Sequence, residues 1–157
     1  MAEKISLSGV PETMLQTVYA RAKETEQRGA ICDKKAVEIV KKLDYDFSLA
    51  DKDTAMSSGV IARTIVLDRR VKQYLEEHPG AVVVNIACGL DTRAYRMDNG
   101  RLTWYNLDLP ETIEVRDSIY QEKGRISTIA CSVLDEKWVE QVKVRGKMLF
   151  IIEGLTM

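Results

Sequence analysis

The first third of the chain carries hydrophobic residues at helical spacing. Three sets recur every three or four positions: Met14, Leu15, Val18 and Ala22; Ala36, Val37, Val40 and Leu43; and Val60, Thr64, Leu67, Val71 and Tyr74. Such spacing puts apolar side chains on one face of a helix. We therefore predict three helices, with a polar, mobile loop over residues 45–59 between the second and the third. Pro79 and Gly80, in "EEHPG", end the third helix.

After residue 80 the pattern changes to four short apolar runs, "AVVVNIA", "LTWYNLDL", "RISTIACSV" and "KMLFIIEG". Runs of this kind, rich in β-branched residues, are typical of strands buried on both faces. Segments of helical composition, "PETIEVRDSIYQEKG" and "DEKWVEQVKVRG", lie between them. Alternating strands and helices predict a parallel sheet with right-handed crossovers.

The whole pattern predicts an α/β fold with a Rossmann-like, doubly wound parallel sheet. We expect a single domain, in which residues 1–79 form an N-terminal helical cap that contributes to the ligand site and residues 80–157 form the first half of a Rossmann-like unit. In such a fold the ligand binds at the carboxyl ends of the strands.

Composition excludes several classes of function. The chain is 45% hydrophobic and 30% charged, with a net charge of −1, which is typical of a globular domain and provides no basic surface for nucleic acid. No apolar run approaches the ~20 residues of a membrane span, and no leader is evident, so we expect a cytoplasmic protein. Cys32, Cys88 and Cys131 are widely spaced, which favours reduced thiols, and no metal-binding cluster is visible.

The loop after the first strand, "NIACGLDT", has Gly89 as its one glycine. A dinucleotide site needs three glycines so that backbone amides can approach a pyrophosphate, which argues against NAD or FAD. Asp108 ends the second strand, 19 positions after Gly89, where an acid in this fold accepts hydrogen bonds from both ribose hydroxyls. Taken singly, Asp108 is equally compatible with starting a turn or capping a helix. The combination predicts an adenosine ligand without a phosphate, a description that S-adenosylmethionine fits.

Five stretches carry a resemblance to a known family: "ACGLDTRAYRM" (87–97), "LDLPETIEVR" (107–116), "DKKAVEIVKKLDYDF" (33–47), "ARTIVLDRRV" (62–71) and the closing "IIEGLTM". In them the chain resembles the leucine carboxyl methyltransferase family, and within it bacterial polyketide O-methyltransferases of the tetracenomycin type. The resemblance implies a class I methyltransferase fold, S-adenosyl-L-methionine as cofactor and a small-molecule methyl acceptor, either polyketide-like or a carboxylate.

For the methionine end of the cofactor, the resemblance implies five residues. Arg63 would hold the carboxylate, a task that suits a planar bidentate donor. Ala87 and Gly89 would bring the backbone close, and Asp91 would fix the loop or the ligand's amino group. Glu153 would lie beside this end of the cofactor; its alternative role is to cap the turn that follows.

For the adenosine end, the resemblance implies three residues. Asp108 would accept hydrogen bonds from the ribose. Ser132 and Val133, after the third strand, would flank the adenine, with Val133 as an apolar wall. Many relatives carry an acid at the position of Ser132.

The implied reaction is direct transfer of an activated sulfonium methyl group to an acceptor aligned behind it. A carboxylate acceptor needs no general base, whereas a phenol or alcohol must lose its proton. The sequence does not choose between these acceptors, and no catalytic residue is assigned.

Relatives in the family continue well past the position of Met157. We therefore expect the chain to be the cofactor-binding part of an O-methyltransferase, without turnover by itself. The alternative is a non-catalytic cofactor-binding module or a subunit completed by a partner chain. The apolar run "MLFII" would form an uncovered sheet edge, which predicts self-association of the chain.

Overall fold

The computed structural model describes residues 5–6 and 11–155. Its internal contacts divide the chain into two compact units. The helical unit comprises Met1–Val71 and Leu90–Met97, and the sheet unit comprises Lys72–Gly89 and Asp98–Met157. The division at residue 79 that we expect from the sequence, with residues 1–79 contributing to the cofactor site, stays a prediction. Within the described residues, no helix combines the length and the apolar character that crossing a membrane requires.

The helical unit contains the three helices that the periodicity predicts. Its elements are β1 (Ile5–Ser6), α1 (Glu12–Gln27), α2 (Lys34–Lys42), β2 (Leu43–Asp44), α3 (Ser48–Lys52), the larger part of α4 (Thr54–Glu77) and α5 (Arg93–Met97). β1 and β2 pair in parallel, with Ile5 opposite Leu43. Helices α1, α2 and α4 confirm the three predicted helices.

The prediction of a polar loop over residues 45–59 was wrong, because α3 and the first turn of α4 occupy it. Asp46 accepts a hydrogen bond from the backbone N–H of Ser48 at 2.9 Å, and Asp53 accepts one from Met56 at 2.9 Å. Aspartates at these positions satisfy backbone donors at the start of a helix. Asp53 therefore caps α4, and Asp46 bonds the first N–H of α3 from the position before its N-cap Phe47.

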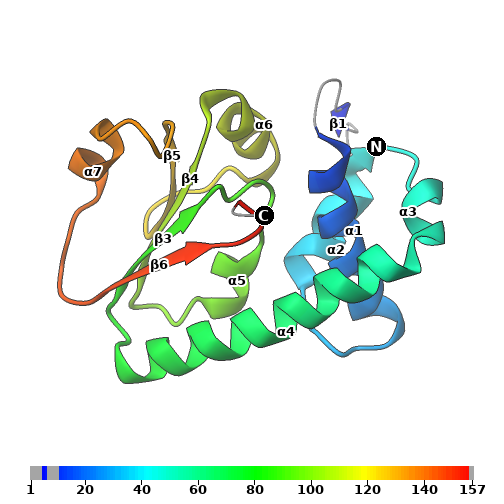
Figure 1. Ribbon diagram of the computed structural model, residues 1–157, viewed down its shortest axis with the longest axis horizontal. Coiled ribbons are helices and arrows are strands. Elements are labelled where there is room, and N and C mark those ends of the chain that lie inside the picture. The colour runs from blue at the N-terminus through cyan, green and yellow to red at the C-terminus, as the bar shows by residue number, and fades with distance from the viewer. Residues whose placement is uncertain (1–4, 7–10, 156–157) are drawn as a thin grey trace. The chain divides into compact units, whose positions relative to one another are not determined.

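The sheet unit contains the four predicted strands, β3 (Val82–Ile86), β4 (Thr103–Asp108), β5 (Ile126–Ala130) and β6 (Met148–Ile152). All pair in parallel, in the order β5-β4-β3-β6 (Figure 1). Helix α6 (Pro110–Tyr120) connects β4 to β5, and α7 (Lys137–Gln141) precedes β6. The predicted α/β fold is confirmed. The strand order reverses between β3 and β6. A ligand is therefore expected at the carboxyl ends of the strands near this point.

The two faces of the sheet differ in chemistry. One face is an apolar cluster built by alternate strand residues and by the segment around α7: Val82, Val84, Ile86, Tyr105, Leu107, Ile129 and Val142, with Val133 and Trp138 packed against it. The other face contains buried asparagines, Asn85 and Asn106. Because successive side chains of a strand alternate between faces, Asn85 and Asn106 share this second face with the buried apolar residues Val83, Trp104 and Ile151.

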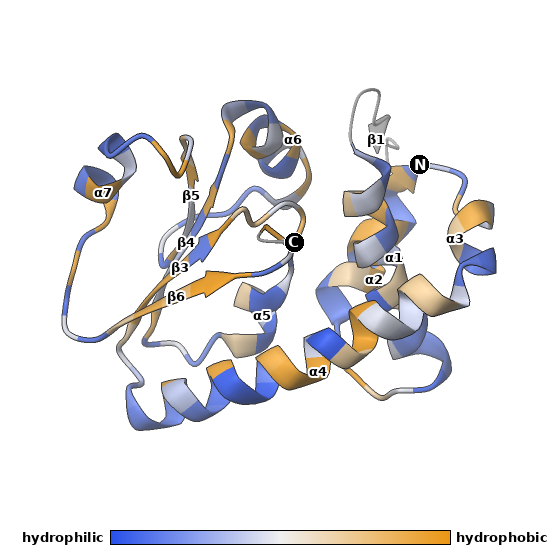
Figure 2. Cartoon of the chain, viewed as in Figure 1, coloured by the Kyte–Doolittle hydropathy of each residue, from blue (hydrophilic) through white to orange (hydrophobic). Residues whose placement is uncertain are grey.

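The predicted apolar edge is also present. β6 is a continuous hydrophobic strand (Figure 2) at one end of the strand order, with Phe150 49% and Ile152 51% exposed. Self-association through this edge stays a prediction.

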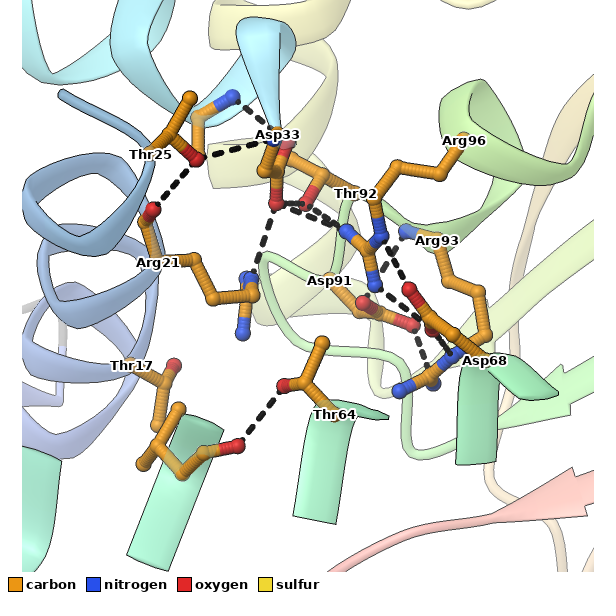
Figure 3. A network of polar contacts seen from close by, with 12 residues as sticks. Thr17, Arg21, Thr25, Asp33, Thr64, Asp68, Asp91, Thr92, Arg93 and Arg96 are labelled. Atoms are coloured by element: carbon orange, nitrogen blue, oxygen red, sulfur yellow. Dashed lines mark hydrogen bonds and ion pairs between the residues drawn. The ribbon is translucent and has the colours of Figure 1, made fainter. Parts of the chain in front are cut away.

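A network of buried ion pairs holds the helical unit together (Figure 3). Asp33, which is fully buried, caps α2 by accepting from the N–H of Ala36 at 3.0 Å. Its other carboxylate oxygen accepts from Arg21 Nε at 3.1 Å, from Arg96 Nη1 at 2.7 Å and from the hydroxyl of Thr92. One carboxylate therefore links α1, α2 and α5.

Two further aspartates complete this network. Asp68 of α4 accepts from Arg96 Nε at 2.6 Å and from Arg93 Nε at 2.8 Å. Asp91 accepts from Arg93 Nη1 at 3.0 Å. The three aspartates balance the three arginines of the network, so the buried charge is neutral in sum, as burial requires.

Asp33→Asn tests the importance of this network for stability. Asparagine keeps an oxygen to cap α2 but removes the charge that Arg21 and Arg96 share. We expect the free energy of unfolding to fall by about 3–5 kcal/mol, because a buried cation loses its partner. Urea denaturation followed by circular dichroism measures this loss.

The matched control is Glu38→Gln, which removes the charge from an exposed carboxylate that pairs with Lys35 and Lys42 in the same unit. A change of at most about 1 kcal/mol is expected there. Equal effects of the two substitutions would show that the Asp33 network does not stabilise the unit more than surface pairs do.

Candidate functional site

The chain turns sharply where β3 ends. Ala87 has φ of 53° and Gly89 has φ of 48°, both in the left-handed region. This region is unfavourable for a residue with a Cβ atom, and such strain persists only where the surroundings impose it. The loop formed by Ala87, Cys88 and Gly89, called here the glycine loop, is therefore held in place by its neighbours.

Asp108 at the end of β4 provides one of these restraints. Its Oδ2 accepts a hydrogen bond from the N–H of Gly89 at 2.8 Å, and its Oδ1 accepts one from the N–H of Leu109 at 2.8 Å. The N–H of Cys88 donates to the carbonyl of Leu107 at 3.1 Å. The structure thus brings together Gly89 and Asp108, the two residues that sequence spacing singled out. Each carboxylate oxygen has two acceptor sites, so both keep capacity for ligand hydroxyls.

Three more predicted site residues follow strands of the same parallel sheet. Ser132 accepts a hydrogen bond from the N–H of Leu134 at 3.2 Å, and Val133 packs against the apolar cluster of the sheet. Glu153 follows β6 and is half-buried. Carboxyl ends of parallel strands meet at one edge of a sheet, so Ser132, Val133 and Glu153 follow strands at the edge where Asp108 lies.

The other two predicted residues belong to the helical unit. Arg63 lies on α4 and is exposed. Asp91 accepts hydrogen bonds from the backbone N–H of Arg93 and from its guanidinium, both at 3.0 Å. The carboxylate of Asp91 therefore caps the start of α5.

Sequence reasoning missed one residue beside the glycine loop, Arg116 of α6. It is fully buried, and its Nη1 donates to the carbonyl of Gly89 at 2.9 Å. Burial by itself would lower the pKa of Arg116, but the ion pair with Glu122 raises it above the usual value. Asn106 in the middle of the apolar run "LTWYNLDL" was the available signal, because a buried strand amide requires polar partners.

In the described part of the chain, no group of three or more His, Cys, Asp or Glu side chains is placed to hold a metal ion. The arrangement of the glycine loop and Asp108 can instead hold a polar organic ligand. Backbone groups lie at the end of β3, and a carboxylate acceptor lies at the end of the neighbouring strand.

The fold is that of a Rossmann-like domain, whose ligands bind at the strand ends. Residues 14–157 match the family model of leucine carboxyl methyltransferases, and the chain belongs to this family. The family expected from the sequence motifs is thereby confirmed.

Two curated relatives are similar over nearly the whole chain. The tetracenomycin polyketide synthesis O-methyltransferase TcmP of Streptomyces glaucescens is 40% identical over 158 residues, which cover 99% of this chain and 58% of that protein. The S-adenosyl-L-methionine-dependent methyltransferase dpfgK of Gibberella zeae is 32% identical over 171 residues, covering 98% of this chain and 57% of that protein. The chain therefore spans a little under three fifths of the length of these relatives.

Gly89→Ala tests the backbone conformation of the glycine loop. A Cβ atom at φ of 48° is expected to lower the free energy of unfolding by about 1–2 kcal/mol. The control is Gly80→Ala in the same unit, where the added Cβ meets no atom within 4 Å; its effect should stay within about 0.5 kcal/mol. Urea denaturation measures both, and an unchanged stability of Gly89→Ala would contradict the left-handed conformation.

Proposed function

We propose that this chain is the cofactor-binding part of an S-adenosyl-L-methionine-dependent O-methyltransferase. The observation that carries the proposal is the hydrogen bond between Gly89 and Asp108, which holds a carboxylate beside a loop that lacks a phosphate-binding glycine pattern. In this fold a carboxylate at that strand end accepts hydrogen bonds from the ribose hydroxyls of an adenosine. Membership of a methyltransferase family and the name of TcmP support methyl transfer, and the name of dpfgK includes the same cofactor.

A dinucleotide is disfavoured by a further feature. In dinucleotide-binding domains, the pyrophosphate lies at the N-terminus of the helix that follows the first strand. Here that helix is α5, and the carboxylate of Asp91 already accepts from the backbone N–H of Arg93. A pyrophosphate at this helix start would find the N–H of Arg93 already in use.

The remaining residues receive their roles from the family resemblance. Arg63 would hold the methionine carboxylate, and Ala87 and Glu153 would line the same end of the cofactor. Asp91, which already bonds Arg93, would act on the conformation of the loop rather than on the ligand. Ser132 and Val133 would flank the adenine, Ser132 through its hydroxyl and Val133 through apolar contact.

The cofactor supplies an activated methyl group when it is bound. The protein must then align an acceptor oxygen behind that group and exclude water. We propose a small-molecule acceptor, polyketide-like or a carboxylate, and a cytoplasmic location.

The second candidate function is a cofactor-binding module without turnover. It is favoured by the fact that the site residues named above all serve the cofactor.

Isothermal titration calorimetry tests the cofactor. We expect the chain to bind S-adenosylhomocysteine and not NAD, because the glycine loop lacks a pyrophosphate cradle. Asp108→Ala should weaken binding by about 1–3 kcal/mol through loss of hydrogen bonds to the ribose. The control is Asp117→Ala on α6, an exposed carboxylate that accepts from Thr128 at 3.1 Å. Binding of NAD in place of S-adenosylhomocysteine would refute the proposal.

A second experiment tests Arg63. Lysine cannot reproduce the bidentate guanidinium fork, so Arg63→Lys should impair binding of S-adenosylmethionine far more than binding of adenosine, which has no carboxylate. Arg69→Lys, another exposed arginine of α4, serves as the control. If both ligands lose affinity equally, Arg63 has a structural role and does not hold the carboxylate.

A further inference from the structure

Arg116 uses all three nitrogens of its guanidinium inside the sheet unit. Nε and Nη2 donate to the two carboxylate oxygens of Glu122 at 3.0 and 2.7 Å, which is a bidentate ion pair. Nη1 donates to the carbonyl of Gly89 at 2.9 Å. Both side chains of the pair are fully buried. A planar fork of donors with this geometry holds its acceptors in fixed positions.

Glu122 is itself held by the sheet. Its two carboxylate oxygens accept from Nδ2 of Asn106 at 3.1 and 3.2 Å, and Oδ1 of Asn106 accepts from Nε1 of Trp104 at 3.0 Å. Both Trp104 and Asn106 lie on β4. Gln121, with φ of 50°, reverses the chain just before Glu122. The ion pair is thus anchored to the strand that ends in Asp108.

Stability alone does not account for this pair. Two charges lose their hydration on burial, and replacing a buried ion pair by apolar residues of similar size is often neutral or stabilising. The contact that distinguishes Arg116 from a purely structural partner of Glu122 is the third one, to the backbone of the glycine loop.

That third contact restrains the peptide group of Gly89 that Asp108 does not bond. The N–H of Gly89 donates to Asp108, and the C=O of Gly89 accepts from Arg116. Both peptide groups of Gly89 are therefore oriented by side chains, in a loop whose backbone is in a left-handed conformation. A loop ordered before the ligand arrives avoids the entropic cost of ordering it on binding.

We propose that Arg116 is a positioning residue for the cofactor, which fixes the glycine loop and Asp108 through the carbonyl of Gly89 and touches no ligand atom itself. This inference rests on the proposed function, since it concerns the same site. Glu122 serves it by holding the guanidinium in place and balancing its charge.

The test replaces the whole pair, Arg116→Met with Glu122→Met, so that no buried charge is left without a partner. We expect the variant to fold with a somewhat lower midpoint of urea denaturation, because no buried charge is left alone but Nδ2 of the buried Asn106 loses its acceptor. The dissociation constant for S-adenosylhomocysteine should rise about tenfold or more, the size expected for losing a charge-assisted hydrogen bond.

If the double variant fails to fold, the dissociation constant for S-adenosylhomocysteine is measured on a second variant, Arg116→Lys. Lysine keeps the charge beside Glu122 but lacks the fork that reaches both Glu122 and Gly89, so binding should again weaken. The control is Arg125→Met, which breaks an ion pair with Asp98 at the surface of the same unit. That change should leave the dissociation constant within about twofold, since exposed pairs contribute little.

Amide hydrogen exchange, followed by NMR, separates positioning from general stabilisation. In the double variant the N–H of Gly89 should exchange faster, while strand amides such as those of Val84 and Tyr105 keep their protection; saturating S-adenosylhomocysteine should restore protection at Gly89. Unchanged affinity and unchanged exchange at Gly89 in a folded variant would overturn the inference. Failure of the parent chain to bind S-adenosylhomocysteine would instead refute the proposed function, and the inference with it.

Discussion

The pairing of buried charge is the constraint on which both units depend. A carboxylate or guanidinium removed from water costs several kcal/mol unless a partner of opposite charge and further hydrogen bonds accompany it. Asp33 in the helical unit and Glu122 in the sheet unit are both fully buried at the side chain, and each is held by arginine. The elements that carry these partners cannot move apart without exposing the pair or leaving a charge alone.

The stretch "ACGLDTRAYRM" divides its residues between two tasks. Its first three residues form the glycine loop after β3, whereas Asp91, Thr92, Arg93 and Arg96 take part in the ion-pair network of the helical unit. Thr92 and Arg93 are buried. The charged side chains Asp91, Arg93 and Arg96 of this motif are thus paired within the helical unit.

The glycine loop shows how a small site can be prepared by few contacts. A strained backbone after β3 is held by a carboxylate from β4 and a guanidinium from α6. Neither side chain is near Gly89 in the sequence, so the parallel strands and the α6 crossover bring them to it. Under the proposal above, binding energy that would otherwise order the loop would remain available for recognising the ligand.

Periodicity along the chain determined the main helices, the four strands and their parallel arrangement, because these depend on the spacing of apolar residues within one segment. The 19-residue spacing of Gly89 and Asp108 was also readable, since the fold places the ends of adjacent strands together. The helices within residues 45–59 were missed, because aspartates such as Asp46 and Asp53 are common in loops, whereas here they bond backbone N–H groups at the starts of α3 and α4. Arg116 and Glu122 were missed for a different reason. From sequence alone, a charged residue is expected to be exposed to solvent. Only the tertiary structure, which places α6 and Glu122 beside Asn106 and Gly89, determines that Arg116 is buried and which groups it bonds.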